Sequence, residues 1–505
     1  MTSSPLASEA QADRWDARVW GLLILLCGVL FLDGLDVSMV GVALPSIQTD
    51  LGVSTSELQW VVSGYVLGYG GLLLLGGRAA DLLGRRKILI IGLSVFAAAS
   101  LLGGLVSDPT LLIATRFLKG ASAAFTAPAG LSIITTTFAE GHVRNRALSI
   151  YAACGASGFS FGLVLGGLLT EIGWRWTFLL PVPFALAILA AAPRLVPKDT
   201  SADPEAKQGY DVGGAVTISS AMLLLVWTVV QAPDSGWGST TTVVAFLAVA
   251  ALLTAFVTIE RRVAHPLVRL GILRSGTLLR ANLGAMTVFG AYVGFQFVGT
   301  LYMQQLLGWS SLETALAFLP AGLIVAFGAP QVGKLVDRVG TAPIIAIGAS
   351  SFVVAYALFL GIDASPVYAL TILPTVLLLG IGFALCFPSL NMQATAGVHD
   401  DEQGLASGLV NTSFQVGGAI ALAVVTGVIG TGSGGRTDAA SLLDGFRPGI
   451  VVVLIVAVLG LIVATVGVVA ARRTVIGERR TALVLARANA NVRDESDPTT
   501  WADAA

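Results

Sequence analysis

Residues 22–45 read LLILLCGVLFLDGLDVSMVGVALP, an apolar run that is interrupted by two aspartates, Asp33 and Asp36. A run of about 20 apolar residues is long enough to cross a bilayer as a helix. A carboxylate at bilayer depth costs about 2.5–3.5 kcal/mol even on the gentlest insertion scale, so such groups face a bundle interior or a water-filled cavity. The stretch therefore predicts a membrane-spanning helix that carries a functional site.

Similar apolar runs recur along the 505 residues, of which 55% are hydrophobic and 12% are charged. Soluble domains carry about 25% charged residues. We predict an all-α integral membrane protein with 14 transmembrane helices. The predicted segments are 18–44, 57–77, 87–106, 110–136, 146–170, 174–193, 212–232, 240–259, 281–307, 314–333, 341–361, 366–390, 404–430 and 448–471.

The basic residues indicate how the chain is oriented. If both termini are cytoplasmic, 24 of the 29 lysines and arginines fall in inner loops and tails, and three fall in outer loops: Arg175, Arg436 and Arg447. Basic residues are concentrated on the cytoplasmic side of membrane proteins. We therefore expect a multi-pass protein of the cell (inner, or cytoplasmic) membrane with both termini in the cytoplasm. The net charge of −1 indicates no basic surface for nucleic acid.

One eight-residue pattern occurs twice, as GRAADLLG at 77–84 and as GKLVDRVG at 333–340. Eight predicted spans separate the two copies, so both would face the cytoplasm, in two parallel halves related by an axis along the membrane normal. Glycines suit a tight turn between helices, and an aspartate can cap a helix start. We expect a conformational role for Gly77, Arg78, Asp81, Gly84, Arg85 and Arg86, and for Gly333, Asp337 and Gly340 in the repeat.

The repeat divides the predicted chain into seven parts. These are a cytoplasmic N-terminal tail (1–17), a six-helix bundle (18–194), a cytoplasmic linker (195–211), two extra transmembrane helices (212–260), a cytoplasmic loop (261–280), a second six-helix bundle (281–471) and a cytoplasmic C-terminal tail (472–505). The apolar segments of the two extra helices contain no ionisable residue, which indicates a structural role.

Several stretches resemble motifs of the major facilitator superfamily. GGRAADLLGRRK (76–87) is similar to its motif A loop, and RFLKG (116–120) to its motif B. LDVSMVGVALP (35–45) resembles motif D1 of its drug:proton antiporters. GFSFGLVLGG (158–167) resembles their motif C, at Gly158, Gly162, Gly166 and Gly167. EQGLASGLVNTSFQVGGA (402–419) resembles the span 13 signature of the fourteen-span branch, the EmrB/QacA type.

The resemblance covers residues 20–470 and implies proton-coupled efflux of lipophilic drug-like or antibiotic compounds by alternating access. Two departures leave the substrate class open: Lys119 stands where motif B usually has glutamine, and Phe414 where a basic residue is common. A third, Leu163 where motif C usually has proline, bears on the antiport prediction. The alternative is a dedicated exporter of one endogenous metabolite by the same mechanism, and Lys119 beside Arg116 would favour an anion.

Four ionisable residues lie well inside predicted spans: Asp33 and Asp36 in the first, and Arg116 and Lys119 in the fourth. The members of each pair are three residues apart and share a helix face. Asp36 and Arg116 lie at similar distances from the outer ends of their spans, and Asp33 and Lys119 each lie one turn deeper, so Asp36 could face Arg116 and Asp33 could face Lys119. The resemblance implies the proximity of the two spans, because similar antiporters place them together. We hypothesise that Asp36 carries the proton and that Arg116 releases it as the cavity alternates. Asp36→Asn should then abolish pH-gradient-driven transport. A purely structural ion pair is the alternative.

Uncharged polar residues of other spans are candidates for the substrate cavity: Gln296, Tyr302, Asn391, Asn411 and Gln415. As a set they are typical of a mainly apolar pocket for an amphipathic ligand. The partners we expect are a small-molecule substrate, protons and the lipid bilayer, with the protein a monomer.

An enzyme is not expected. No histidine lies in a predicted span, and no metal-ligand spacing occurs. The Gly-rich string GTGSGG (430–435) lacks the Lys-Ser/Thr that a nucleotide-binding loop needs. We therefore predict no metal and no cofactor.

Overall fold

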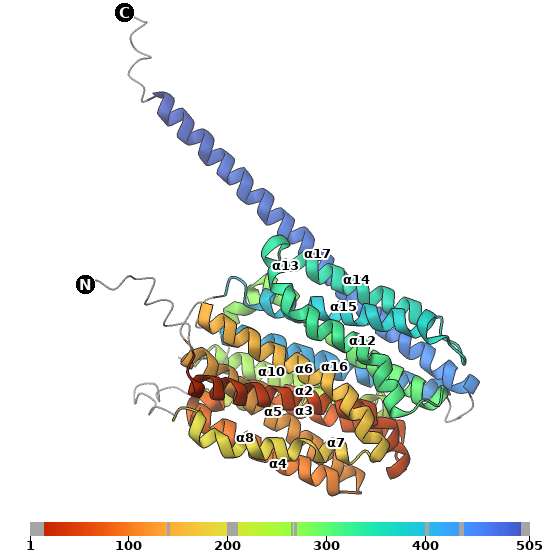
Figure 1. Ribbon diagram of the computed structural model, residues 1–505. Coiled ribbons are helices and arrows are strands. Elements are labelled where there is room, and N and C mark those ends of the chain that lie inside the picture. Colours follow the sequence, from red (N-terminus) through yellow and green to blue (C-terminus); the bar gives the residue numbers. More distant parts are fainter. Residues whose placement is uncertain are drawn as a thin grey trace, which may run out of the picture.

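The computed structural model describes residues 15–138, 142–198, 211–263, 266, 270–398, 403–433 and 439–495. The regular structure within these ranges is helical, as predicted, and 13 of the described helices are long and apolar enough to cross a membrane. The remaining predicted segment, 146–170, falls on α6 (His142–Ile172). Figure 1 shows the helices packed side by side in one bundle, with α17 (Ala439–Glu495) continuing beyond it.

We call residues 18–194 the first half of the chain and residues 281–471 the second half. The first half contains α2 (Ala17–Leu51), α3 (Thr55–Leu83), α4 (Arg85–Leu105), α5 (Pro109–Thr137), α6, α7 (Trp176–Leu179) and α8 (Pro181–Leu195). The second half contains α11 (Gly276–Leu301), η3 (Tyr302–Leu306), α12 (Ser311–Gly328), η4 (Ala329–Gln331), α13 (Val332–Val339), α14 (Thr341–Phe359), α15 (Tyr368–Thr395), α16 (Gln403–Ser433) and α17. Between the halves lie α9 (Val212–Ser235), α10 (Thr240–Glu260) and η2 (Leu270–Arg274).

The same helix pairings occur in both halves. In the first half α2 packs on α6, and α5 packs on both α3 and α4. In the second half α11 packs on α16, and α15 packs on both α12 and α14. The two halves thus share one packing pattern, as expected for an internal repeat.

The two helices that lead into the repeated pattern also begin alike. Ser54 caps α3 in a capping box with Glu57, and Ser310 caps α12 in a capping box with Glu313. Each box satisfies free backbone N–H groups at a helix start. The second box lies 256 positions after the first, which is also the offset between the two copies of the Gly-rich pattern. The repeat is therefore longer than the eight residues that reveal it.

The last glycine of each copy makes a tight turn between two helices. Gly84 joins α3 to α4 with a φ of 99°, and Gly340 joins α13 to α14 with a φ of 81°. Positive φ is strained for residues with a side chain, so this turn requires glycine, as predicted. Arg78 lies in α3, and Arg85 and Arg86 lie in the first turn of α4, where Arg86 donates to the carbonyl of Pro193 at 2.7 Å. The side chain of Asp81 lies outside the described part of the structure.

The second copy differs from the first in one respect. Helix α3 passes through Gly77 without a break, whereas the corresponding helix of the second half ends at Gly328 and resumes as α13 after the 3-10 turn η4. Pro330 lies in that turn and lacks the backbone N–H that a continuous helix would need. Gly333 and Asp337 lie in α13, where Asp337 is exposed.

Helices α9 and α10 form a pair on one side of the molecule. Helix α9 packs on α3 of the first half and on α16 of the second, while α10 packs on α9. An apolar cluster that includes Val66, Val226 and Val416 joins α3, α9 and α16. The inserted pair therefore covers a seam between the two halves.

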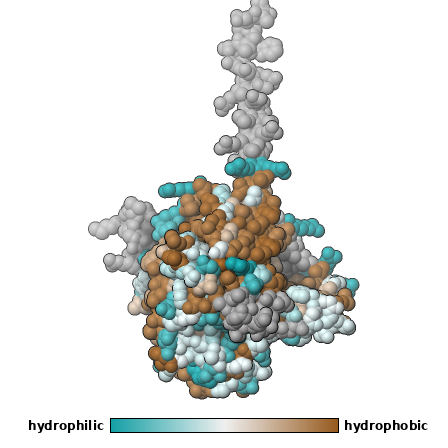
Figure 2. Space-filling view, turned by 90° about the vertical axis from the view of Figure 1, so that its right-hand side faces the viewer, coloured by the Kyte–Doolittle hydropathy of each residue, from teal (hydrophilic) through white to brown (hydrophobic). Residues whose placement is uncertain are grey.

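Apolar side chains cover much of the outside of the bundle. Figure 2 shows hydrophobic residues over much of one face of the molecule. Phe184, Phe327 and Leu370 are 57%, 74% and 77% exposed. Such surfaces are expected where helices meet lipid in place of water.

Candidate functional site

A three-membered ion cluster lies buried between α2 and α5. Arg116 and Lys119 lie one turn apart on α5, and both donate hydrogen bonds to the carboxylate of Asp36, Arg116 to Oδ2 and Lys119 to Oδ1. None of the three side chains is more than 2% exposed. Arg116 also donates through Nε to the carbonyl of Val61 on α3 at 2.9 Å. The carboxylate thus offsets part of the charge of the two cations in a buried region, where an unpaired ion would be costly.

Aromatic rings surround the two cations. The Arg116 guanidinium lies 4.9 Å from the centre of the Tyr65 ring. The Lys119 ammonium lies 5.0 Å from the Phe96 ring and 5.1 Å from the Phe178 ring. Cations over aromatic faces are attracted by the ring quadrupole, most strongly where water is excluded. The rings therefore stabilise both charges and close the cluster.

The predicted contact between Asp36 and Arg116 is present, but the predicted pairing of Asp33 with Lys119 is not found in this structure, where Lys119 contacts Asp36. Lysine has a flexible four-carbon stem, so the Lys119 ammonium can pass over Asp33, expected at its own depth, and reach Asp36 one turn along α2. Lys119 joins Arg116 on Asp36. Asp33 retains 8% exposure, and its Oδ2 is buried without a hydrogen-bond partner in the described structure.

The glycines of the predicted motif C bring α6 into contact with its neighbours. A Cβ added at Gly158 would lie 2.3 Å from the carbonyl oxygen of Phe31, and one at Gly162 would lie 2.0 Å from Oγ of Ser38. Gly166 lies against Met39 of α2 in the same way, whereas Gly167 faces Ala315 of α12. The stripe thus fixes α6 against α2 and contacts the second half near the C-terminal end of α6.

A cluster of aromatic rings, absent from the sequence-based candidates, lies mainly in the second half. Adjacent rings in it have centroids 4.6–6.5 Å apart. Its members are Phe159 of α6, Phe289 and Tyr292 of α11, Phe383 and Phe387 of α15, and Phe414 of α16. The spacings 289/292 and 383/387 place each pair on one helix face and were the available sequence signal. We call these six residues the aromatic cluster.

The predicted cavity residues take different positions. Gln296 lies opposite Gly41 of α2, and Gln415 lies opposite Gly70 of α3, so both face the first half. Asn391 and Asn411 each donate to a carbonyl one turn back on their own helix, both at 2.9 Å.

Tyr302 is not a cavity residue in this structure, contrary to the prediction. Its side chain is completely buried and its hydroxyl donates to the carbonyl of Asp363 at 2.7 Å. Phe359 and Phe446 contact its ring edge-on. The large apolar ring is held in the core of the second half because its one polar atom finds a partner there.

Several hydrogen bonds join the halves near the helix ends that the charge distribution assigns to the outside. Gln304 donates to the carbonyl of Val42 at 3.0 Å, and Gln305 donates to Gln48 at 2.8 Å. Thr426 of α16 donates to Gln59 of α3. The backbone N–H of Leu312 donates to Glu171 at 3.2 Å. These contacts hold the two halves together at one end of the bundle.

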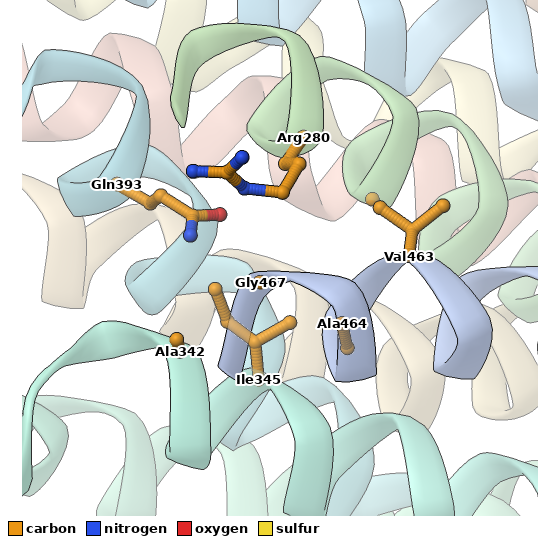
Figure 3. Close-up of a pocket in the computed structure, with 8 residues that line it drawn as sticks. Arg280, Ala342, Ile345, Gln393, Val463, Ala464 and Gly467 are labelled. Carbon is orange, nitrogen blue, oxygen red and sulfur yellow. The ribbon is translucent and has the colours of Figure 1, made fainter. Parts of the chain in front are cut away.

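A separate small pocket, lined mainly by apolar residues, lies in the second half between α11, α14, α15 and α17. Figure 3 shows the guanidinium of Arg280 and the carboxamide of Gln393 pointing toward each other across it, with Ala342 and Gly467 from the other two helices. None of these four helices contributes to the ion cluster.

The chain is a multi-pass integral membrane protein built on a transporter fold, with a buried ion cluster in one half and an aromatic cluster largely in the other. A family model described as Major Facilitator Superfamily matches residues 26–422. The chain belongs to this superfamily, as its motifs predicted. It is therefore a membrane transporter and not an enzyme.

Curated relatives extend along almost the whole chain. The puromycin resistance protein pur8 of Streptomyces alboniger is 36% identical, over 91% of this chain and 92% of that protein. The cephamycin export protein CmcT of Amycolatopsis lactamdurans is also 36% identical, over 91% of this chain and 95% of that protein. The tetracenomycin C resistance and export protein of Streptomyces glaucescens is 30% identical, over 81% of this chain and 75% of that protein.

Solved transporter structures share the fold. A bacterial homologue of the human lysosomal transporter Spinster, solved in an inward-facing and occupied conformation, aligns with a TM-score of 0.62 and 14% identity over 92% of this chain and 97% of that chain. A D-xylose-proton symporter aligns with a TM-score of 0.61 and 16% identity over 89% of this chain and 97% of that chain. The family and its relatives support drug efflux by a transporter of this superfamily.

Proposed function

We propose that this protein exports lipophilic drug-like or antibiotic compounds from the cell in exchange for protons, by alternating access between its two halves. The observation that carries the proposal is the ion cluster of Asp36, Arg116 and Lys119, buried in the first half beside a second carboxyl group, Asp33. Ionisable groups inside the membrane are costly and commonly serve proton or ion coupling. The names of the relatives support the drug-export part.

The aromatic cluster supports a lipophilic substrate. Phe159 reaches it from the first half, and Tyr292 lies 5.9 Å from Phe159, so the cluster meets the boundary between the halves. Phe387 is 36% exposed. Rings from α6, α11, α15 and α16 would offer the mainly apolar surface that is usual for a site for small molecules.

The contacts between halves support a cycle of alternating access. The hydrogen bonds of Gln304, Gln305 and Thr426 lie at the end that we assign to the outside. We infer that they close the outer entrance, and that they break when the transporter opens outward. The turns at Gly84 and Gly340 would fix the inner helix ends during this movement.

We also propose the full predicted topology: 14 spans, two six-helix bundles with α9 and α10 inserted between them, and both termini in the cytoplasm. Figure 1 shows the N-terminal end of the bundle and the projecting part of α17 at the same end of the molecule, which supports an even number of spans. Labelling of single introduced cysteines with a membrane-impermeant reagent tests it, with Ser201 expected to be protected in intact cells and Gly434 to be labelled.

A dedicated exporter of one endogenous compound is the second candidate. It is favoured by relatives whose names refer to a single compound, such as cephamycin or tetracenomycin C. The anion preference expected from Lys119 loses support, because Lys119 and Arg116 are buried against Asp36.

Transport in inside-out vesicles with an imposed pH gradient tests the proposal. The panel comprises puromycin, lincomycin, a cephamycin, ethidium as a lipophilic cation and benzoate as an acid. Accumulation that collapses with the pH gradient and extends to several of the lipophilic compounds supports the proposed function. Accumulation of one compound alone favours the dedicated exporter, and accumulation that ignores the pH gradient contradicts proton coupling.

A further inference from the structure

Asp33 and Asp36 lie one turn apart on α2 in opposite surroundings. Asp36 is completely buried, and Arg116 and Lys119 occupy its two carboxylate oxygens. Asp33 keeps 8% exposure, and its Oδ2 is buried without a hydrogen-bond partner among the described residues. A charged carboxylate with a bare buried oxygen is costly, whereas the protonated form is neutral and cheaper to bury. The arrangement is therefore that of one fixed carboxylate beside one carboxyl group that can bind a proton.

The titratable groups that face Asp33 come from four helices. They are Asp36 of α2, Tyr65 and Tyr69 of α3, Lys119 of α5 and Tyr151 of α6. Lys119 is the cation among these groups, and in this structure it donates to Asp36, as Arg116 also does. The site thus holds two cations against one paired carboxylate, with a second carboxyl group within reach.

Building on the proposed antiport, we propose that Asp33 binds and releases the transported proton, and that Lys119 exchanges between the two aspartates as it does so. With the proton on Asp33, Lys119 donates to Asp36, as the structure shows. When Asp33 gives its proton to water, the new charge draws the Lys119 ammonium one turn along α2. The O–H bond of Asp33 is the one covalent bond that breaks, and Lys119 keeps its three protons and changes its acceptor.

This exchange leaves no buried charge unpaired in either state. In the deprotonated state Asp36 would keep Arg116 and Asp33 would gain Lys119, which is the ladder that the sequence predicts. Arg116 is held by the Val61 carbonyl and the Tyr65 ring. Lysine has a flexible stem with a compact charge, so Lys119 is the partner that moves. Because uncompensated buried ions are strongly destabilising, proton release and the movement of Lys119 would occur together.

Infrared difference spectroscopy on the full chain in lipid, titrated with pH, tests the assignment without any substrate. Wild type should show a protonated-carboxyl band, one component of which disappears as the pH rises. Asp33→Asn should lack that component. The matched control is Asp50→Asn, which removes an exposed carboxylate of α2, the helix that also carries Asp33. Asp50 is paired with Arg175, and this variant should keep the component. Lys119→Gln removes the alternative partner and should shift the loss of the component to higher pH. An unchanged spectrum in Asp33→Asn overturns the proposal.

Transport of puromycin supplies the second measurement. A gradient of ~1 pH unit can support about a tenfold concentration gradient per proton. Asp33→Asn should lose this accumulation but retain exchange of labelled for unlabelled puromycin, which shows that the variant is folded and binds. Accumulation by Asp33→Asn at the wild-type level overturns the inference. If wild type itself does not accumulate puromycin, the proposed function fails for this compound, and the infrared result still decides the role of Asp33.

Discussion

Thr426 of α16 donates a hydrogen bond to Gln59 of α3, across 367 residues of sequence and between the two halves of the chain. Both side chains are buried, at 5% and 2% exposure. The contact lies near the start of α3 and near the end of α16, and both of these ends belong to the outer side in the proposed topology. In the proposed cycle, closure of the outer entrance therefore uses a small number of polar contacts that can be removed one at a time.

Gln59→Ala should shift the transporter toward its outward-open state. A lost hydrogen bond is worth about 1 kcal/mol, which changes the ratio of closed to open molecules by about fivefold. Spin labels at the outer ends of α2 and α12 should show a larger share of long distances. The control Thr254→Ala removes a hydroxyl that bonds within α10 at 2.7 Å and should leave the distances unchanged. Identical distributions for both variants would show that this bond does not hold the entrance.

Asp36→Asn should destabilise the protein more than Lys119→Met does. Loss of Asp36 leaves two buried cations without their carboxylate, and breaking a buried pair in this way costs about 3–5 kcal/mol. Loss of Lys119 leaves Asp36 paired with Arg116. Thermal unfolding of the purified variants in one detergent gives the order directly. A reversed order would mean that Arg116 and Lys119 are stabilised mainly by their aromatic neighbours.

Gly162→Ala should separate α6 from α2. The added Cβ would lie 2.0 Å from Oγ of Ser38 and 2.5 Å from the carbonyl oxygen of Leu35. Overpacking of this kind costs about 1–3 kcal/mol, so the unfolding temperature and the yield in membranes should fall. Gly408→Ala is the matched control, because its Cβ would meet Leu74 at an ordinary 3.6 Å. Equal stability of the two variants would contradict the close packing described here.

Phe383→Ala should weaken the binding of planar aromatic compounds. Phe383 lies 4.6 Å from Tyr292 and 5.3 Å from Phe387, at the centre of the aromatic cluster. Aromatic pairs contribute about 0.5–1.5 kcal/mol beyond their buried area, so the Kd for ethidium should rise several-fold in fluorescence titrations. Phe184→Ala, at a ring that is 57% exposed on α8, is the control. Unchanged ethidium binding in Phe383→Ala would place the substrate elsewhere.

The local features of the fold could be predicted from the sequence. Apolar length identified the helices, and the spacing of the Gly-rich pattern identified the turns at Gly84 and Gly340, because both signals lie within a few residues. Helix ends were less accurate: α2 continues through Pro45 to Leu51, where the predicted segment stops at residue 44. Helix α2 stops at its C-cap, Gly52, whose positive φ of 65° ends the helix, and hydropathy does not report backbone geometry of this kind.

The contacts of the site were harder to predict because they depend on tertiary packing. Helix depth located Asp36 opposite Arg116 but could not say which carboxylate the flexible Lys119 would reach. Tyr302 has the same apolar and polar character whether it lines a cavity or fills a core, and its partner, the Asp363 carbonyl, is 61 residues away. The bond between Gln59 and Thr426 has no local signal at all.

The position of α9 makes the two seams of the transporter unequal. At one seam α3 meets α16 beneath α9, and at the other α6 meets α12 directly. A compound dissolved in the bilayer that approaches the first seam encounters an additional layer of helix, packed through Val226 and Val230. Sideways entry from the membrane would thus be one-sided, through the boundary where Ser160 of α6 donates to the Gly322 carbonyl of α12 at 2.9 Å.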